Sequence, residues 1–231
     1  METEGLTERE ALRADWVRRV PGWYSPWAHL AFTSGVGLGL AILALASTRG
    51  LRPWQLLFIP LVWLFSNATE WRAHRDLLHR EQRWARPLFV QHTVQHHRLY
   101  RTDDMAIRSS RELRMVLIPA FGILLIFAIT LPVAALLWAV GQPNLAALWI
   151  ATTMGYVVSY EWLHLSYHLP PHGPLGGSRL LRRLGRHHAV HHAPERMQRW
   201  NLNVTVPLCD LLFGTLYREE RADPAVERTA P

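Results

Sequence analysis

The sequence predicts an all-α membrane protein with four transmembrane helices and a helical cap on the cytoplasmic side of the membrane. Two observations carry this prediction. Four apolar segments are long enough, or nearly long enough, to cross a bilayer, which takes about 20 residues of helix. The polar stretches beside them hold ten of the thirteen histidines in four clusters. Hydrophobic residues form 49% of the chain and charged residues only 19%, which favours a membrane.

The elements follow one another in a single membrane-embedded domain, 1–231. The first 26 residues start with an acidic stretch and lack the apolar run of a signal peptide. We expect an amphipathic helix over about 7–20, either lying on the membrane surface or packed as an ordinary surface helix. The rest is predicted as spans over about 27–48, 54–70, 115–140 and 145–163, cytoplasmic metal-binding regions over 71–114 and 164–217, and a flexible tail over 218–231.

Arginine supplies every basic side chain, because the sequence has no lysine, and the formal net charge is +7. Nearly all arginines lie near the N-terminus, in 71–114 or after 168, whereas the turns 49–53 and 141–144 carry two and none. The positive-inside rule places the arginine-rich parts in the cytoplasm. We therefore expect a multi-pass protein of a bacterial inner membrane with cytoplasmic termini. Its basic face is expected to meet anionic lipid, with no nucleic-acid partner.

The histidine clusters read HRDLLH, HTVQHH, HLSYH and HAVHH, in chain order. Imidazole is a good ligand for iron, zinc, copper and nickel. Ten imidazoles exceed the four to six or so ligands that one ion accepts, so a dinuclear site is predicted. On an ideal α-helix the histidines of HLSYH share a face, as do the first and second of HTVQHH and the three of HAVHH. His74 and His79, five residues apart, splay by about 140° on such a helix, which also favours two metals.

Polar residues outside the four clusters are not expected to bind metal directly. His29, at the start of a span, is expected to be an interfacial or packing residue, and His172, among prolines, a loop residue. One cysteine, Cys209, excludes an internal disulfide. Four carboxylates are candidate acceptors for imidazole N–H groups, or else surface partners of arginine: Glu70, Asp76, Glu161 and Asp210.

These clusters, followed directly by NVTVPLCDLLFGT, resemble the fatty acid hydroxylase / sterol desaturase superfamily of integral-membrane di-iron oxygenases. The resemblance covers about 54–217. His187 stands where the family often has an aromatic residue and is left out, and HTVQHH has one residue more between its first two histidines than many members have. The resemblance implies two iron ions, or zinc in isolated protein, on these ligands: His74, His79, His92, His96, His97, His164, His168, His188, His191 and His192.

The resemblance also implies an activity. A lipid C–H bond in an acyl chain, sterol or isoprenoid would be hydroxylated with O₂ as cosubstrate. Electrons would come from a separate cytochrome b5-like or ferredoxin-like protein with an NAD(P)H reductase, because the chain contains no such stretch. Desaturation, or hydroxylation of a carotenoid or lipid head group, are alternatives within the superfamily. A metal-binding protein or metal transporter is the alternative of another class, which would place ionisable ligands near the middle of its spans.

Overall fold

The computed structural model describes residues 2–170 and 178–218 and is helical throughout, apart from loops and one isolated β-bridge between Arg101 and Asp104. His172 and all but the first residue of the predicted tail lie outside the described residues. The longer helices are α1 (Glu2–Arg19), α2 (Pro26–Ala46), α3 (Phe58–Ala73), α7 (Ala120–Ala139), α8 (Pro143–Tyr167) and α9 (Arg179–His191). Short helical pieces join them: η1 (Pro53–Leu57), η2 (His74–Leu78), η3 (Arg83–Ala85), α4 (Arg86–Phe89), η4 (Val90–His96), α5 (His97–Leu99), η5 (Ser110–Glu112), α6 (Leu113–Val116) and α10 (Leu208–Leu212).

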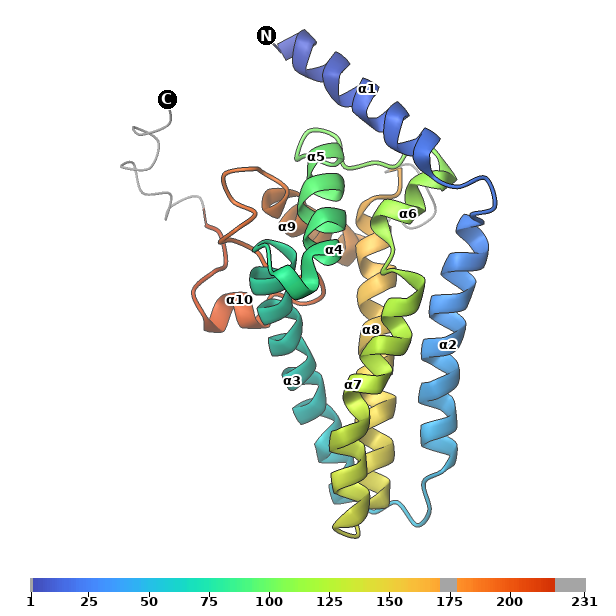
Figure 1. The fold of residues 1–231 in the computed structure, drawn as a ribbon. Coiled ribbons are helices and arrows are strands. Elements are labelled where there is room, and N and C mark those ends of the chain that lie inside the picture. Colours follow the sequence, from blue (N-terminus) through green and yellow to red (C-terminus); the bar gives the residue numbers. More distant parts are fainter. Residues whose placement is uncertain (1, 171–177, 219–231) are drawn as a thin grey trace.

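Helix α8 is the central helix of a bundle with α2, α3 and α7, and it contacts all three (Figure 1). Small residues allow the close approach that apolar helix packing favours. Gly37 of α2 is an example, because a Cβ there would lie 2.5 Å from a methyl group of Val158 in α8. Met154, one turn before Val158, is fully buried in the same contact region.

The outer surface of the bundle is apolar. Leu61, Ile129 and Leu136 are each more than half exposed, whereas a helix bundle in water covers such residues. Two helical stretches, Pro26–Ala46 and Ser110–Ala139, are long and apolar enough to cross a membrane. These two stretches support membrane association. Of the four predicted spans, only the two that coincide with these stretches are long and apolar enough by this criterion. α3 has only 16 residues, and α8 carries Tyr156 and Glu161 among its buried residues.

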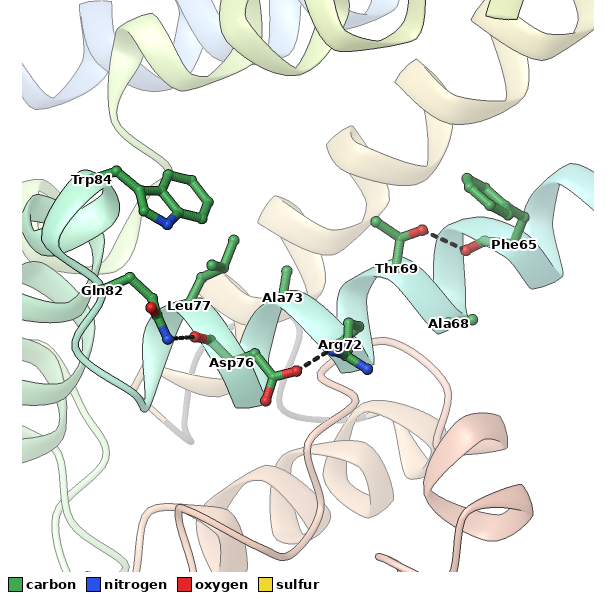
Figure 2. Close-up of a pocket in the computed structure, with 9 residues that line it drawn as sticks. All are labelled: Phe65, Ala68, Thr69, Arg72, Ala73, Asp76, Leu77, Gln82 and Trp84. Carbon is green, nitrogen blue, oxygen red and sulfur yellow. Dashed lines mark hydrogen bonds and ion pairs between the residues drawn. The ribbon is translucent and has the colours of Figure 1, made fainter.

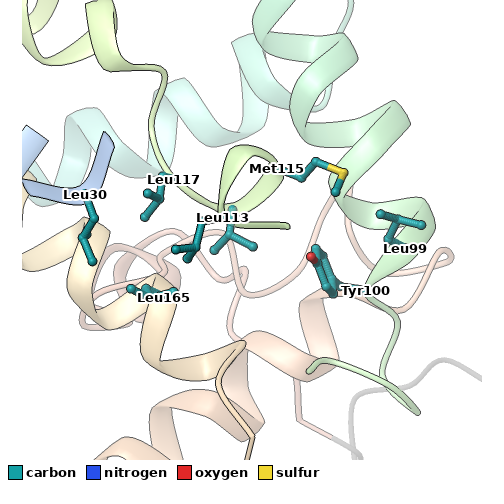
Figure 3. Packing of buried hydrophobic residues seen from close by; sticks show 8 residues of the cluster. Leu30, Leu99, Tyr100, Leu113, Met115, Leu117 and Leu165 are labelled. Carbon is teal, nitrogen blue, oxygen red and sulfur yellow. The ribbon is translucent and has the colours of Figure 1, made fainter. Parts of the chain in front are cut away.

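Apart from η1, which lies in the turn between α2 and α3 at the opposite end, the remaining elements form a cap at one end of the bundle (Figure 1). Its apolar centre contains Leu99, Tyr100 and Leu113 of the cap, packed with Leu30 and Leu165 from the bundle (Figure 3). This cluster ties the cap to the ends of α2 and α8, so the cap is held in a fixed position over the bundle.

Helix α1 lies against the cap. Leu12 and Trp16, on its apolar face, pack on the cluster of Figure 3, and Val20 is buried. Arg13 is buried as well and pairs with Glu112 at 2.6 Å. The helix starts earlier than expected, at Glu2. Of the two alternatives the ordinary surface helix holds, because the apolar face of α1 packs on protein and completes the core of the cap.

Candidate metal centre

The ten histidines predicted as ligands meet where the cap joins the bundle. They form two groups of five, and within each group one nitrogen of every ring lies within 4.8 Å of the others. All ten side chains are buried. Each group draws on three segments that are far apart in the sequence. The first group is His74, His79, His92, His97 and His191, and the second group is His96, His164, His168, His188 and His192.

A π-helical turn places His74 and His79 in the same group. In η2 the amide of His79 donates to the carbonyl of His74, five residues earlier, at 3.1 Å. The two rings stack with their centroids 4.9 Å apart. The predicted splay of about 140° is wrong because it assumes an α-helix. A π-helix closes hydrogen bonds between residues i and i+5, so it brings residues five apart onto one side.

The second π-helical piece, η4, divides HTVQHH between the groups. His97 follows His92 by five residues and joins it in the first group, with their Nε2 atoms 3.1 Å apart. His96 follows His92 by four residues yet belongs to the second group. The rings of His92 and His96 still stack, 5.2 Å apart. These two residues share a side as predicted, and the boundary between the groups passes between them.

The cluster in α9 also serves both groups. The Nε2 atoms of His188 and His192 are 3.0 Å apart in the second group. His191 belongs to the first group, with its Nε2 atom 3.0 Å from that of His79. Three imidazoles predicted on one helix face therefore supply two sites. The pair in HLSYH, at the C-terminal end of α8, stays together in the second group as predicted.

Backbone carbonyls orient the rings by accepting hydrogen bonds from Nδ1. In the first group, His74 donates to the carbonyl of Leu202 at 2.5 Å and His191 to that of Trp200 at 2.9 Å. The second group uses another part of the chain. There His192 donates to Tyr100 at 2.6 Å, His168 to Met105 at 2.8 Å and His96 to Met115 at 3.1 Å. Loop 200–205 thus orients two rings of the first group, and segment 100–115 orients three rings of the second.

This orientation suits metal binding. A neutral imidazole that donates from Nδ1 carries a lone pair at Nε2. Nε2 of His74 lies 2.9 Å from Nε2 of His92, and Nε2 of His96 lies 3.2 Å from Nε2 of His164. Among the described residues, Nε2 of His168 is buried without a hydrogen-bond partner. Without a proton between them, two such nitrogens direct lone pairs at one another, and a cation between them converts the repulsion into coordination. The donor set is entirely imidazole in both groups of described residues, which fits iron or zinc.

Burial keeps these rings neutral. It lowers the pKa of His74 and of His168 to about 4. Burial and the neighbouring imidazoles lower the pKa of His96 and His191 well below the usual value of 6.5. The neutral form is the one that binds a metal, so both groups are ready to coordinate at neutral pH.

Two of the four candidate carboxylates have no contact with the ligand rings. Glu161 accepts a hydrogen bond from the hydroxyl of Thr33 at 2.5 Å. Asp76 forms ion pairs with Arg72, Arg75 and Arg80. The expectation that these carboxylates accept from imidazole is wrong, since arginine and hydroxyl donors stand closer. For Asp76 the arginine-paired alternative holds.

The other two candidates, Glu70 and Asp210, accept hydrogen bonds from the backbone of loop 200–205. Glu70 accepts from the amides of Val204 and Thr205. Asp210 accepts from the amides of Leu202 and Asn203, at 2.8 and 2.9 Å. Both carboxylates bond to the loop whose carbonyls accept from His74 and His191, and not to the imidazole rings of the ten histidines. The expectation that these two carboxylates accept from the imidazole N–H groups of the ten histidines is therefore wrong as well, because backbone amides of loop 200–205 occupy their oxygens.

Glu112 has the equivalent role in segment 100–115 and was not predicted. One carboxylate oxygen accepts from the amides of Arg108 and Ser109, at 3.1 Å each. The other accepts from Tyr100 at 3.0 Å and from Arg13 at 2.6 Å. Ser109 and Glu112 form a capping box, and that Ser-x-x-Glu pattern is a sequence signal that could have drawn attention to it.

The histidines excluded as ligands lie outside both groups where they are described. His29 accepts from the hydroxyl of Tyr24 and donates to the carbonyl of Ile118, both at 2.8 Å, as expected of a packing residue. Nε2 of His187 lies 3.2 Å from the carbonyl of Asn203. His187 therefore helps to hold loop 200–205 in place.

The family model described as fatty acid hydroxylase matches residues 59–215. The chain belongs to the fatty acid hydroxylase family. The matched range contains all ten histidines, loop 200–205 and segment 100–115. The resemblance drawn from the histidine clusters is confirmed, and the family makes this protein an oxidoreductase.

Comparison with solved structures shows the same fold for this member of the fatty acid hydroxylase family. It is similar to the structure described as full-length scs7p with only the hydroxylase domain visible, at a TM-score of 0.55 and 20% sequence identity. The alignment covers 84% of this chain and 67% of the other. At this identity the likeness shows the fold alone. No curated protein sequence gives a significant match.

Proposed function

We propose that the protein is an O₂-dependent hydroxylase that inserts one oxygen atom into a C–H bond of a membrane lipid, using two iron ions held by the ten histidines. The observation that carries the proposal is the pair of all-imidazole groups with converging Nε2 atoms. Membership of the fatty acid hydroxylase family supports a lipid substrate. The substrate class is an acyl chain, sterol or isoprenoid.

Two bound iron ions would supply the redox chemistry that activates O₂. The overall reaction converts R–H, O₂, two electrons and two protons into R–OH and water. The electrons come from a separate cytochrome b5-like or ferredoxin-like protein and its NAD(P)H reductase. The protein's own residues hold the ions and exclude water from them, since all ten ligand side chains are buried. The carbonyls of Leu202 and Tyr100 fix ring direction in the two groups.

Placement in a membrane brings the substrate to the site. We propose that α2, α3, α7 and α8 all span the bilayer, with the cap and both termini in the cytoplasm of a bacterium. The apolar outer surface of the bundle supports this placement. In such an arrangement a lipid reaches the cap from the bilayer and the electron donor reaches it from water. A metal transporter is disfavoured because the histidine groups lie at the cap and not in the middle of the spans.

The test compares the lipids of cells that lack the protein with those of cells re-supplied with wild type, His96→Ala, His191→Ala or His29→Gln. Mass spectrometry should find a lipid heavier by one oxygen with wild type and with His29→Gln. It should be absent with the two alanine variants, although both still insert in membranes. A product lighter by two hydrogens would instead establish a desaturase. Full activity of both alanine variants would refute the site, and metal analysis of purified wild type should give about two iron ions per chain.

A further inference from the structure

A hollow of about 530 Å³ lies beside the C-terminal half of α3 and the turn that follows η2 (Figure 2). Its lining comes from residues 65–84 and contains none of the ten histidines. Ala73 and Leu77 face the hollow, whereas His74, in the same turns, points into the buried first group. One helix therefore separates the hollow from the metal groups, and the hollow is a distinct site.

Most of the lining is apolar. Phe65, Thr69, Ala73 and Leu77 recur every four residues and project from one side of the helix, as Figure 2 shows. Trp84 faces them from the turn. Trp84 is 76% exposed and Phe65 56% exposed. Large aromatic side chains this exposed are typical of a membrane interface, where an acyl chain covers the ring.

One end of the hollow is basic. Arg72 lines it and pairs with Asp76, which also contacts Arg75 and Arg80. The segment 72–86 carries five arginines against two carboxylates. One carboxylate cannot neutralise three guanidinium groups, so a second anion is favoured at this end. Arg72 and Arg80 keep exposed side chains that can contact it.

The order of these features along the chain matches that of a lipid. The apolar, exposed part of α3, with Leu61 and Leu64, leads to the apolar part of the hollow. The arginines follow, as they do where a span leaves the hydrocarbon for an anionic surface. A soluble anion would use only the arginines and leave the aromatic side chains uncovered.

We propose that this hollow binds one anionic phospholipid from the surrounding bilayer. An acyl chain lies against Phe65, Leu77 and Trp84, and the phosphate contacts Arg72 and Arg80. Because Asp76 and Leu77 belong to η2, the bound lipid stabilises the π-helical turn that presents His74 and His79. The site rests on the proposed membrane placement and is independent of hydroxylation.

The test is native mass spectrometry of the purified, metal-loaded protein, released from nanodiscs of phosphatidylcholine and phosphatidylglycerol in equal amounts. One phosphatidylglycerol should stay bound, in at least about tenfold preference to phosphatidylcholine, since each arginine contributes roughly a fivefold preference for an anionic lipid. Arg72→Gln with Arg80→Gln should abolish the preference. Thr69→Phe, which fills the hollow without changing charge, should abolish retention of the lipid.

Controls distinguish the hollow from the rest of the surface. Trp138→Ser, in an exposed tryptophan at the far end of α7, and Arg19→Gln, in an exposed arginine of α1, should leave retention unchanged. Equal retention of the two lipids, or full retention in Thr69→Phe, would overturn the proposal. The His96→Ala variant should lose hydroxylation but still retain the lipid. Lipid binding and hydroxylation can therefore be tested separately, and failure of one does not imply failure of the other.

Discussion

Replacing Asp210 by asparagine tests whether loop 200–205 controls the first histidine group. The buried carboxylate accepts from the amides of Leu202 and Asn203 and from the hydroxyl of Thr215, at 2.8, 2.9 and 2.6 Å. Asparagine offers one acceptor oxygen and one donor NH₂, so at least one backbone amide loses its acceptor. A hydrogen bond to a charged group stabilises a protein by about 1.5–3 kcal/mol, and an unsatisfied buried donor costs a similar amount. We therefore expect Asp210→Asn to lower the free energy of unfolding by about 3 kcal/mol.

The effect on metal binding should be confined to one ion. Displacing the loop moves the carbonyls of Trp200 and Leu202 away from His191 and His74. Loss of such outer contacts typically lowers metal affinity by about 10–100-fold. The second group keeps its acceptors in segment 100–115. We expect Asp210→Asn to lose one of its two ions at a chelator concentration about 10–100-fold lower than wild type requires.

The assay is elemental analysis of protein dialysed against graded chelator, with circular dichroism to confirm folding. Asp76→Asn is the matched control, because Asp76 contacts only surface arginines among the contacts described and should keep both ions. A folded Asp210→Asn protein that loses both ions together, or neither, would refute the assignment of one loop to one group.

Three further predictions follow from the same contacts. Glu112→Gln should weaken the ion of the second group in the same chelator titration, because it disturbs the segment that orients His96, His168 and His192; equal loss from both groups would contradict this. Arg13→Met should lower the free energy of unfolding by about 3–5 kcal/mol, because it leaves Glu112 buried without its ion pair. The same variant should expose α1 to protease. Arg18→Met, at an exposed arginine of the same helix, should change neither the stability nor the protease sensitivity. Metal-free protein should lose stability as the pH falls from about 6.5 towards 4, because unfolding lets His74 and His168, whose pKa values burial lowers to about 4, take up protons. Each buried histidine should lower the free energy of unfolding by up to about 1.4 kcal/mol for each pH unit of this fall. Urea titrations that give the same free energy of unfolding over this range would show that the rings are not buried and neutral.

The convergence of the ten histidines and the helical class could be predicted from the sequence, because both depend on residue type and approximate spacing. Clusters of histidine next to apolar segments identify the ten candidate ligands whatever their exact direction. The division into two groups could not be predicted, since it depends on the rotation per residue within η2 and η4. His92 and His96 share a side, as an α-helix predicts, yet serve different groups.

The outer contacts were harder to predict, because they involve backbone atoms. Every residue has a carbonyl, so nothing in the sequence marks those of Trp200, Leu202 or Tyr100 as acceptors for imidazole. Glu70 and Asp210 were found as carboxylates near clusters, but the structure shows them bonded to amides. The role of α1 stayed open between two alternatives, because an amphipathic pattern alone does not distinguish a helix on a membrane surface from one that packs on the core of a cap.

The π-helical turns make the metal centre sensitive to chain length. Removing one residue between His74 and His79 would let η2 rewind as an α-helix with four-residue spacing, and removing one between His92 and His97 would do the same for η4. Each following residue would rotate by about 100° relative to the preceding helix. A change that alters no histidine could thus move a ring from one of the two histidine groups to the other. In this chain the number of residues between histidines specifies the two groups as firmly as the histidines themselves.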